Sequence, residues 1–143
     1  HNMTPVISKE ELSEYLAEVF PQVWSQFEIL EMDGRHTVMK LKVNDRHIRP
    51  GGTVSGPAMF GLADVSAYVA TLAVVGRKAL AVTTSCSIDF MRKPEAGKDL
   101  IAHAELLKHG KALTVTDVRL RSEGSEDLVA RASLTYSVPP VKS

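Results

Sequence analysis

The feature that most constrains this chain is a long apolar segment with a single charged residue in it. From Pro57 to Val75 the sequence reads PAMFGLADVSAYVATLAVV, and Asp64 is its only acid or base. Aspartate is unfavourable inside a helix, and an ionised carboxylate is costly to bury without a partner. The chain therefore needs either a group that compensates Asp64 or a chemical use for it.

The flanks of this segment predict one long helix. Gly56 and Pro57 stand at its start, where proline is favoured, and Gly76 stands where glycine commonly ends a helix. A helix that is apolar nearly all round must be covered on most sides. Its length would also suit a membrane span, but Asp64 and the strand-like segments around it favour a buried helix. We expect a soluble, cytoplasmic protein.

The segments on both sides of this helix predict a short helix and six strands. Ser8 and Glu11 form a capping-box pattern that opens a helix ending near Pro21. Asp33-Gly34 is a hairpin signal between two segments that alternate apolar and polar residues. The expected strands cover 27–33, 36–43, 79–91, 99–107, 112–122 and 128–138. The expected fold is α+β, an antiparallel sheet of six strands curled around one central helix.

Composition narrows the function further. The 143 residues include 17 basic and 17 acidic side chains, and this zero net charge argues against nucleic-acid binding by bulk electrostatics. Cys86 is the only cysteine, and we interpret it as a core thiol. The sequence holds no metal-binding spacing and no phosphate or dinucleotide loop, so no metal or cofactor is expected. We expect one domain over 3–140, with 1–2 an expression remnant and 141–143 a tail.

The order of elements and one motif resemble a known family. The segment SGPAMFGLADVSAYVA resembles the HGG-x-x-x-x-L-x-D motif of hotdog-fold acyl-CoA thioesterases of the phenylacetate-degradation type. The later segment TTSCSIDFMRKPEAGKDLIAHAELLKHGK is similar to a strand, basic turn and strand of the same family. The resemblance covers about residues 27–138. It implies the hotdog fold, hydrolysis of acyl-CoA thioesters and a homo-oligomer, either a dimer or a tetramer.

The resemblance also implies roles for individual residues. The family's carboxylate falls on Asp64, the glycine whose amide binds the thioester oxygen falls on Gly56, and a hydroxyl that positions water falls on Thr83. Three positions depart from the family, whose histidine, second glycine and loop asparagine are replaced here. The replacements are Ser55, Pro57 and Arg49.

The remaining substrate contacts are expected from residue type. Met59 and Phe60 would line the acyl tunnel with the sheet. Arg92 and Lys93, in the basic turn, would contact the phosphates of coenzyme A. Arg49 stands where substrate would enter and would pair with a carboxylate or a phosphate.

The spacing of Gly56 and Asp64 has a geometric consequence. Eight residues separate them, which is about 12 Å along one helix. An oxyanion donor and a catalytic carboxylate must both lie about 3 Å from adjacent atoms of one carbonyl group. One chain cannot satisfy this, whereas two antiparallel copies of the helix across a two-fold axis can. A thioesterase site here would therefore need a dimer, with Asp64 from one chain and Gly56 from the other.

Other interpretations of the same residues stay open. Asp64 could be a structural acid bonded to a nearby hydroxyl, such as that of Ser66 or Thr71. The departures from the motif motivate a protein that binds acyl-CoA without hydrolysing it. A hotdog hydratase would need an aspartate–histidine pair near the helix start, and His47 lies in the preceding loop without that spacing.

Overall fold

The computed structural model describes residues 2–140 of the chain. Six antiparallel strands form one sheet in the order β1-β2-β4-β5-β6-β3, so that β1 and β3 are its edges. The predicted sheet is confirmed. His1 of the expected remnant and the expected tail, 141–143, lie outside the described residues. The strands are β1 (Phe27–Met32), β2 (His36–Leu41), β3 (Val82–Phe90), β4 (Leu100–His109), β5 (Leu113–Ser122) and β6 (Leu128–Ser137).

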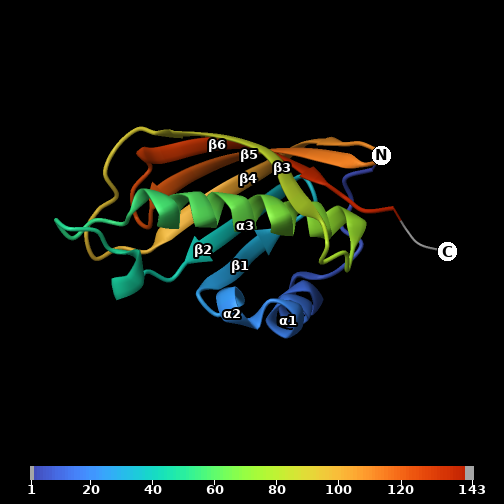
Figure 1. The fold of residues 1–143 in the computed structure, drawn as a ribbon, viewed down its shortest axis with the longest axis horizontal. Helices are drawn as coiled ribbons and strands as arrows, with labels where there is room; N and C mark the ends of the chain where they lie inside the picture. The colour runs from blue at the N-terminus through green and yellow to red at the C-terminus, as the bar shows by residue number, and fades with distance from the viewer. Residues whose placement is uncertain (1, 141–143) are drawn as a thin grey trace.

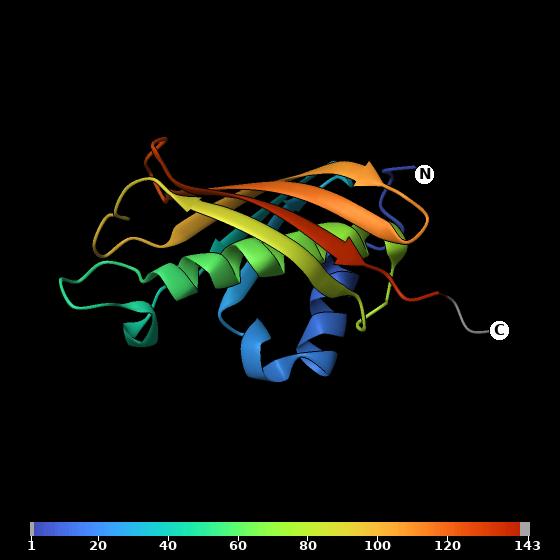
Figure 2. The same cartoon turned by 45° about the horizontal axis from the view of Figure 1, so that its top comes forward.

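Helix α3 (Gly56–Val75) crosses one face of this sheet, as Figures 1 and 2 show. The predicted ends of the helix are confirmed. The Ser55 side chain caps the first turn, and Gly76 ends the helix with a φ of 88° and an N–H that donates to the Leu72 carbonyl. Side chains of α3 and of the strands below it pack into one core. The fully buried ones include Leu62, Val69, Leu72, Met39, Leu100, Val118, Leu120 and Leu134.

The β1–β2 hairpin turns where the sequence predicts it. The Asp33 carboxylate accepts hydrogen bonds from the N–H groups of Arg35 and His36, at 3.0 and 2.7 Å. Gly34 has a φ of 98°, and a side chain there would collide with the Met3 carbonyl. Glycine is therefore required at this turn for two independent reasons.

The N-terminal segment forms two helices where one was predicted. Helix α1 (Lys9–Val19) begins with the expected capping box of Ser8 and Glu11. The chain then forms a short helix, α2 (Pro21–Trp24), because proline suits the first position of a new helix as well as the end of an old one. The loop before α3 also contains a 3-10 turn, η1 (Asp45–His47), which the sequence does not predict.

Edge strand β3 differs from the prediction in its exposure. It is shorter than the predicted 79–91, and most of its side chains are exposed. The interpretation of Cys86 as a core thiol is wrong, since Cys86 is exposed on this strand. The apolar residues Val82 and Phe90 are 56% and 52% exposed. β3 pairs only with β6, so one protomer leaves these apolar side chains and a row of backbone hydrogen-bonding groups of β3 uncovered.

By length and composition alone, α3 could cross a membrane, and it is the only such helix in residues 2–140. Most of its surface is buried within the protein's own fold. Helix α3 is therefore a core helix buried against the strands, as the sequence predicts.

Candidate active site

The carboxylate of Asp64 is held by two hydroxyl groups. Thr83 Oγ1 on β3 donates to Asp64 Oδ1 at 2.6 Å, and the Tyr136 hydroxyl on β6 lies 2.8 Å from the same oxygen. Thr83 and Tyr136 are paired neighbours in the β3–β6 ladder, so both side chains reach the middle of α3 from one sheet position. The resemblance implies that the Thr83 hydroxyl positions water, whereas in the structure this hydroxyl donates to Asp64 itself.

Tyr136 is the member of this cluster that sequence reasoning missed. Its side chain is 3% exposed. Burial, and then the nearby charge of Asp64, raise the pKa of the Tyr136 hydroxyl, so it keeps its proton and remains a donor. Inward-facing alternation along β6 predicts that Tyr136 points to the core. It gives no indication that the hydroxyl meets Asp64, which lies 72 residues earlier.

The structural alternative for Asp64 named other hydroxyls, and these bond elsewhere. Ser66 Oγ donates to the Leu62 carbonyl at 2.7 Å, and Thr71 pairs with Thr114 at 2.6 Å. Both bonds to the Asp64 side chain go to Oδ1. Within residues 2–140, no group donates to Oδ2. One carboxylate oxygen is thus fixed and the other is available for chemistry.

Asp64 opens onto two adjoining cavities, which together we call the Asp64 cleft. The first, of about 390 Å³, lies towards β3 and the end of α1. The second, of about 290 Å³, runs along α3 towards the loop that precedes it. Phe20, Asp64 and Val65 line both. The volumes are those of small-molecule sites.

His47 lines the second cavity, but both of its ring nitrogens are occupied. Nδ1 accepts from the Asn44 N–H at 2.9 Å, and Nε2 lies 2.5 Å from Gln26 Oε1. The histidine therefore positions the loop, and its environment offers no free nitrogen for the acid–base role that a hydratase would require.

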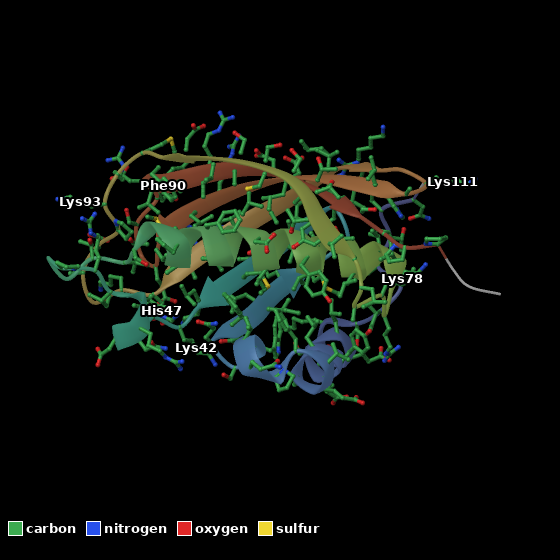
Figure 3. All side chains as sticks on the ribbon, viewed as in Figure 1. Lys42, His47, Lys78, Phe90, Lys93 and Lys111 are labelled. Atoms are coloured by element: carbon green, nitrogen blue, oxygen red, sulfur yellow. The ribbon has the colours of Figure 1, made fainter. Side chains whose placement is uncertain are left out.

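A separate cavity of about 400 Å³ lies at the N-terminus of α3, and we call it the Gly56 pocket. Figure 3 shows Phe90 and Lys93 at this end of the molecule. The expected substrate-binding cations gather here with Gly56 and Met59, and Asp64 does not line this pocket. Its lining is Arg49, Thr53, Val54, Gly56, Met59, Phe90, Met91, Arg92, Lys93 and Pro94.

The backbone at Gly56 is suited to bind an anion. Gly56 is the first residue of α3, and in the described part of the chain its N–H meets no acceptor, as is usual in a first helical turn. The Phe90 ring lies 3.6 Å from the point that a Gly56 Cβ would occupy. Ser55 accepts from the Ala58 N–H at 3.3 Å, so its side chain has a capping role.

Met59 and Phe60, the two residues expected in the acyl tunnel, do not line the Asp64 cleft. Met59 is buried at the Gly56 pocket, and Phe60 lies 38% exposed on the outer side of α3. Pro57 is exposed and lines the Asp64 cleft. Arg92 is partly engaged already, since its Nε donates to the Leu128 carbonyl at 3.1 Å.

The predicted separation within one chain is present in the structure. Gly56 and Asp64 line different cavities of one protomer. Between them on the outer side of α3, Pro57, Phe60 and Gly61 are not fully buried. Pro57 and Gly61 line the Asp64 cleft together with residues of the α1–α2 segment and of β1 and β2.

Comparisons with known proteins agree on one family. The sequence model described as thioesterase superfamily matches residues 51–129. Human acyl-coenzyme A thioesterase 13 is 27% identical over 119 residues, which is 83% of this chain and 84% of that protein. A solved structure of a candidate thioesterase from a Silicibacter species is 56% identical, with a TM-score of 0.90 over 96% of each chain.

A more distant structure extends the likeness. A phenylacetic acid degradation protein of Thermus thermophilus is 25% identical, with a TM-score of 0.70 over 83% of this chain and 99% of that one. The family match covers more than half of this chain and includes both Gly56 and Asp64. The chain therefore belongs to the thioesterase superfamily, as a thioester hydrolase with the hotdog fold, similar to the thioesterases of the phenylacetate-degradation type.

Proposed function

We propose that this protein hydrolyses acyl-CoA thioesters to a free acid and coenzyme A, with Asp64 as the catalytic carboxylate. The observation that carries the proposal is the geometry of that carboxylate: Thr83 and Tyr136 hold Oδ1, and Oδ2 is left free beside a cavity. The name of the human relative, acyl-coenzyme A thioesterase 13, supports coenzyme A thioesters as the substrate class.

In the proposed mechanism, Oδ2 of Asp64 takes a proton from a water molecule as that water attacks the thioester carbonyl carbon. The carbon–sulfur bond then breaks, and the sulfur leaves as a thiolate that recovers the proton. Alternatively, Oδ2 attacks the carbon itself and the carbon–sulfur bond breaks to release the coenzyme A thiolate. Water then hydrolyses the mixed anhydride, which regenerates the Asp64 carboxylate, releases the acid and supplies the proton that the thiolate takes up. Both routes need one free oxygen on an otherwise fixed carboxylate.

The oxyanion donor in this proposal is the Gly56 N–H of a second protomer. A helix N-terminus provides free N–H groups and a positive dipole end, which stabilise a developing negative charge. Because Gly56 and Asp64 line different cavities of one chain, a two-fold dimer with antiparallel α3 helices would complete each site. The exposed apolar residues of β3 favour the same arrangement.

The nucleotide end of the substrate would occupy the Gly56 pocket. Arg49, Arg92 and Lys93 supply positive charge there, which suits the phosphates of coenzyme A. Met59 would contact the part of coenzyme A nearest the thioester. Two dimers could associate further into a tetramer without changing this site, and we expect the enzyme to act in the cytoplasm.

Substitution of Asp64 by asparagine tests the catalytic role. Asp64→Asn keeps the shape of the side chain but removes the base and the nucleophile, so coenzyme A release should fall about 1,000-fold or more. Release is measured with a thiol reagent over short, aromatic and long acyl-CoA substrates, and the dimer is checked by light scattering. Undiminished turnover in a folded Asp64→Asn dimer would refute the mechanism. Substrates that bind but are never hydrolysed by the native protein would instead favour the non-catalytic acyl-CoA binder.

A further inference from the structure

We propose that the Asp64 cleft selects acyl groups that are neutral and apolar along their whole length, and rejects those that end in a carboxylate. This inference rests on the proposed function, because it names the acyl class that the same site accepts. It is carried by the charges, hydrogen bonds and ring packing of the residues that line the cleft.

Charge is the first argument. Among the described residues that line the two cavities of the cleft, none is a lysine or an arginine. The only carboxylate there is Asp64 itself. A second carboxylate on the acyl group would enter without a cation to pair with and would be repelled by Asp64.

His47 cannot supply the missing cation. Burial, and then the nearby charge of Arg46, lower its pKa, so the ring is neutral near pH 7. Protonation would also cost the hydrogen bond that Nδ1 accepts from the Asn44 N–H. The part of the cleft that His47 lines therefore has no positive charge either.

The tyrosines that line the cleft use their hydroxyl groups elsewhere. The Tyr68 hydroxyl donates to the Ala79 carbonyl at 2.8 Å, and the Tyr136 hydroxyl is bonded to Asp64. Tyr68 packs edge to face against Phe20, with ring centroids 6.3 Å apart, and lies 5.8 Å from Tyr136. These rings contribute apolar surface to the wall, with no free donor for a distant polar group.

The cations of the site are segregated at its other end. Arg49, Arg92 and Lys93 line the Gly56 pocket and lie outside the cleft. A thioester bound across the proposed dimer would then have its anionic nucleotide at the cationic end and its acyl chain among aromatic and aliphatic side chains. Because of this separation, the substrate can bind in only one orientation.

A pair of substrates that differ only at the far end of the acyl chain tests the inference. Hexanoyl-CoA and adipoyl-CoA have the same chain length, and adipoyl-CoA ends in a carboxylate where hexanoyl-CoA has a methyl group. We expect kcat/KM to favour hexanoyl-CoA by about 100-fold or more. Calorimetric titration of both thioesters against the native protein measures the same preference in binding, independently of turnover.

A charge placed at the mouth of the cleft should narrow this preference. Val19 ends α1, is 42% exposed and lines the first cavity, so Val19→Lys adds a cation there in a position that the helix dipole also favours. We expect the ratio for hexanoyl-CoA over adipoyl-CoA to fall about 10-fold. Val6→Lys is the matched control, because Val6 is 65% exposed and lies outside the cleft, and the ratio should not change.

The outcomes separate this inference from the proposed function. Equal turnover or equal binding of the two thioesters by the native protein would overturn the inference while leaving hydrolysis intact. A strong binding preference for hexanoyl-CoA without any coenzyme A release would support the cleft and refute the hydrolase. A Val19→Lys ratio equal to that of Val6→Lys, in folded proteins, would show that the selectivity does not arise in this cleft.

Discussion

At the scale of single residues, the two oxygens of the Asp64 carboxylate differ: in the described part of the chain, one accepts hydrogen bonds and the other does not. Oδ1 of Asp64 accepts from Thr83 and Tyr136, which fixes the orientation of the whole group. Oδ2 accepts no hydrogen bond within residues 2–140, and Asp64 lines both cavities of the Asp64 cleft. A carboxylate with both oxygens bonded would be held more firmly but would leave no oxygen for a reacting group. The asymmetry of the cluster therefore supports the proposed catalytic role of Asp64.

Removal of one of these hydroxyls should slow turnover without weakening binding. Tyr136→Phe keeps the ring packing and deletes one hydrogen bond to a charged group, so we expect kcat to fall about 10-fold while KM stays within about 2-fold. Tyr68→Phe is the matched control, since its hydroxyl bonds to the Ala79 carbonyl in the same cavity wall. Steady-state kinetics on both variants decides the point, and equal kcat values for the two would remove Tyr136 from the mechanism.

At the scale of elements, helix α3 presents different chemistry at its start and at its middle. Its first N–H lies in a pocket with three cations, and its central carboxylate lies beside an apolar cleft. The caps that fix the ends of the helix, Ser55 and Gly76, also fix the spacing between these two groups. Helix α3 therefore forms the core of the fold and also sets the distance between Gly56 and Asp64.

The Gly56 amide can be tested at this scale with two substitutions. Gly56→Pro removes the N–H at a helix position where proline is tolerated, and should lower kcat about 100-fold. Gly56→Ala keeps the N–H, and its Cβ would meet the Phe90 ring at an ordinary contact distance of 3.6 Å. We expect Gly56→Ala to retain turnover within about 5-fold. Similar losses in both variants, with unchanged helix content by circular dichroism, would assign the effect to crowding instead of to the lost donor.

Some helix and turn boundaries can be predicted from the sequence, and others cannot. The bounds of α3 are predictable because Gly56, Pro57 and Gly76 are local signals with a direct backbone cause. The β1–β2 turn is predictable for the same reason. Short helix α2 is not, because a proline that ends one helix can begin the next.

The site itself is less predictable than the elements that carry it. Asp64 stands out as the one charge in an apolar helix, and the resemblance points to Thr83. Tyr136 comes from a strand far along the chain, and only the three-dimensional pairing of β3 with β6 brings it to Asp64. The exposure of Cys86 escapes prediction as well, because the local sequence pattern does not tell an edge strand from a core strand.

At the scale of the whole molecule, one protomer leaves three features incomplete on one side. β3 exposes apolar side chains, α3 has an uncovered stripe around Asp64, and the proposed oxyanion donor, Gly56, lines a different cavity from Asp64. A second copy related by a two-fold axis would resolve all three together.

Mixing two inactive variants tests this arrangement directly. A heterodimer of Asp64→Asn and Gly56→Pro chains contains one site in which both residues are native and one in which both are altered. After unfolding and refolding of an equal mixture, random pairing should restore about a quarter of native activity. Each variant refolded alone is the control. A site contained within one protomer would give no recovery, since every chain in the mixture then carries a defect.

In the proposed dimer, the open edge of β3 would also make catalysis depend on protein concentration. Dissociation would separate the two halves of every site and, in the same event, release a strand whose backbone is ready to pair with any other extended chain. Dilution would then reduce specific activity, and prolonged storage of the separated subunits would favour insoluble material over reassembly.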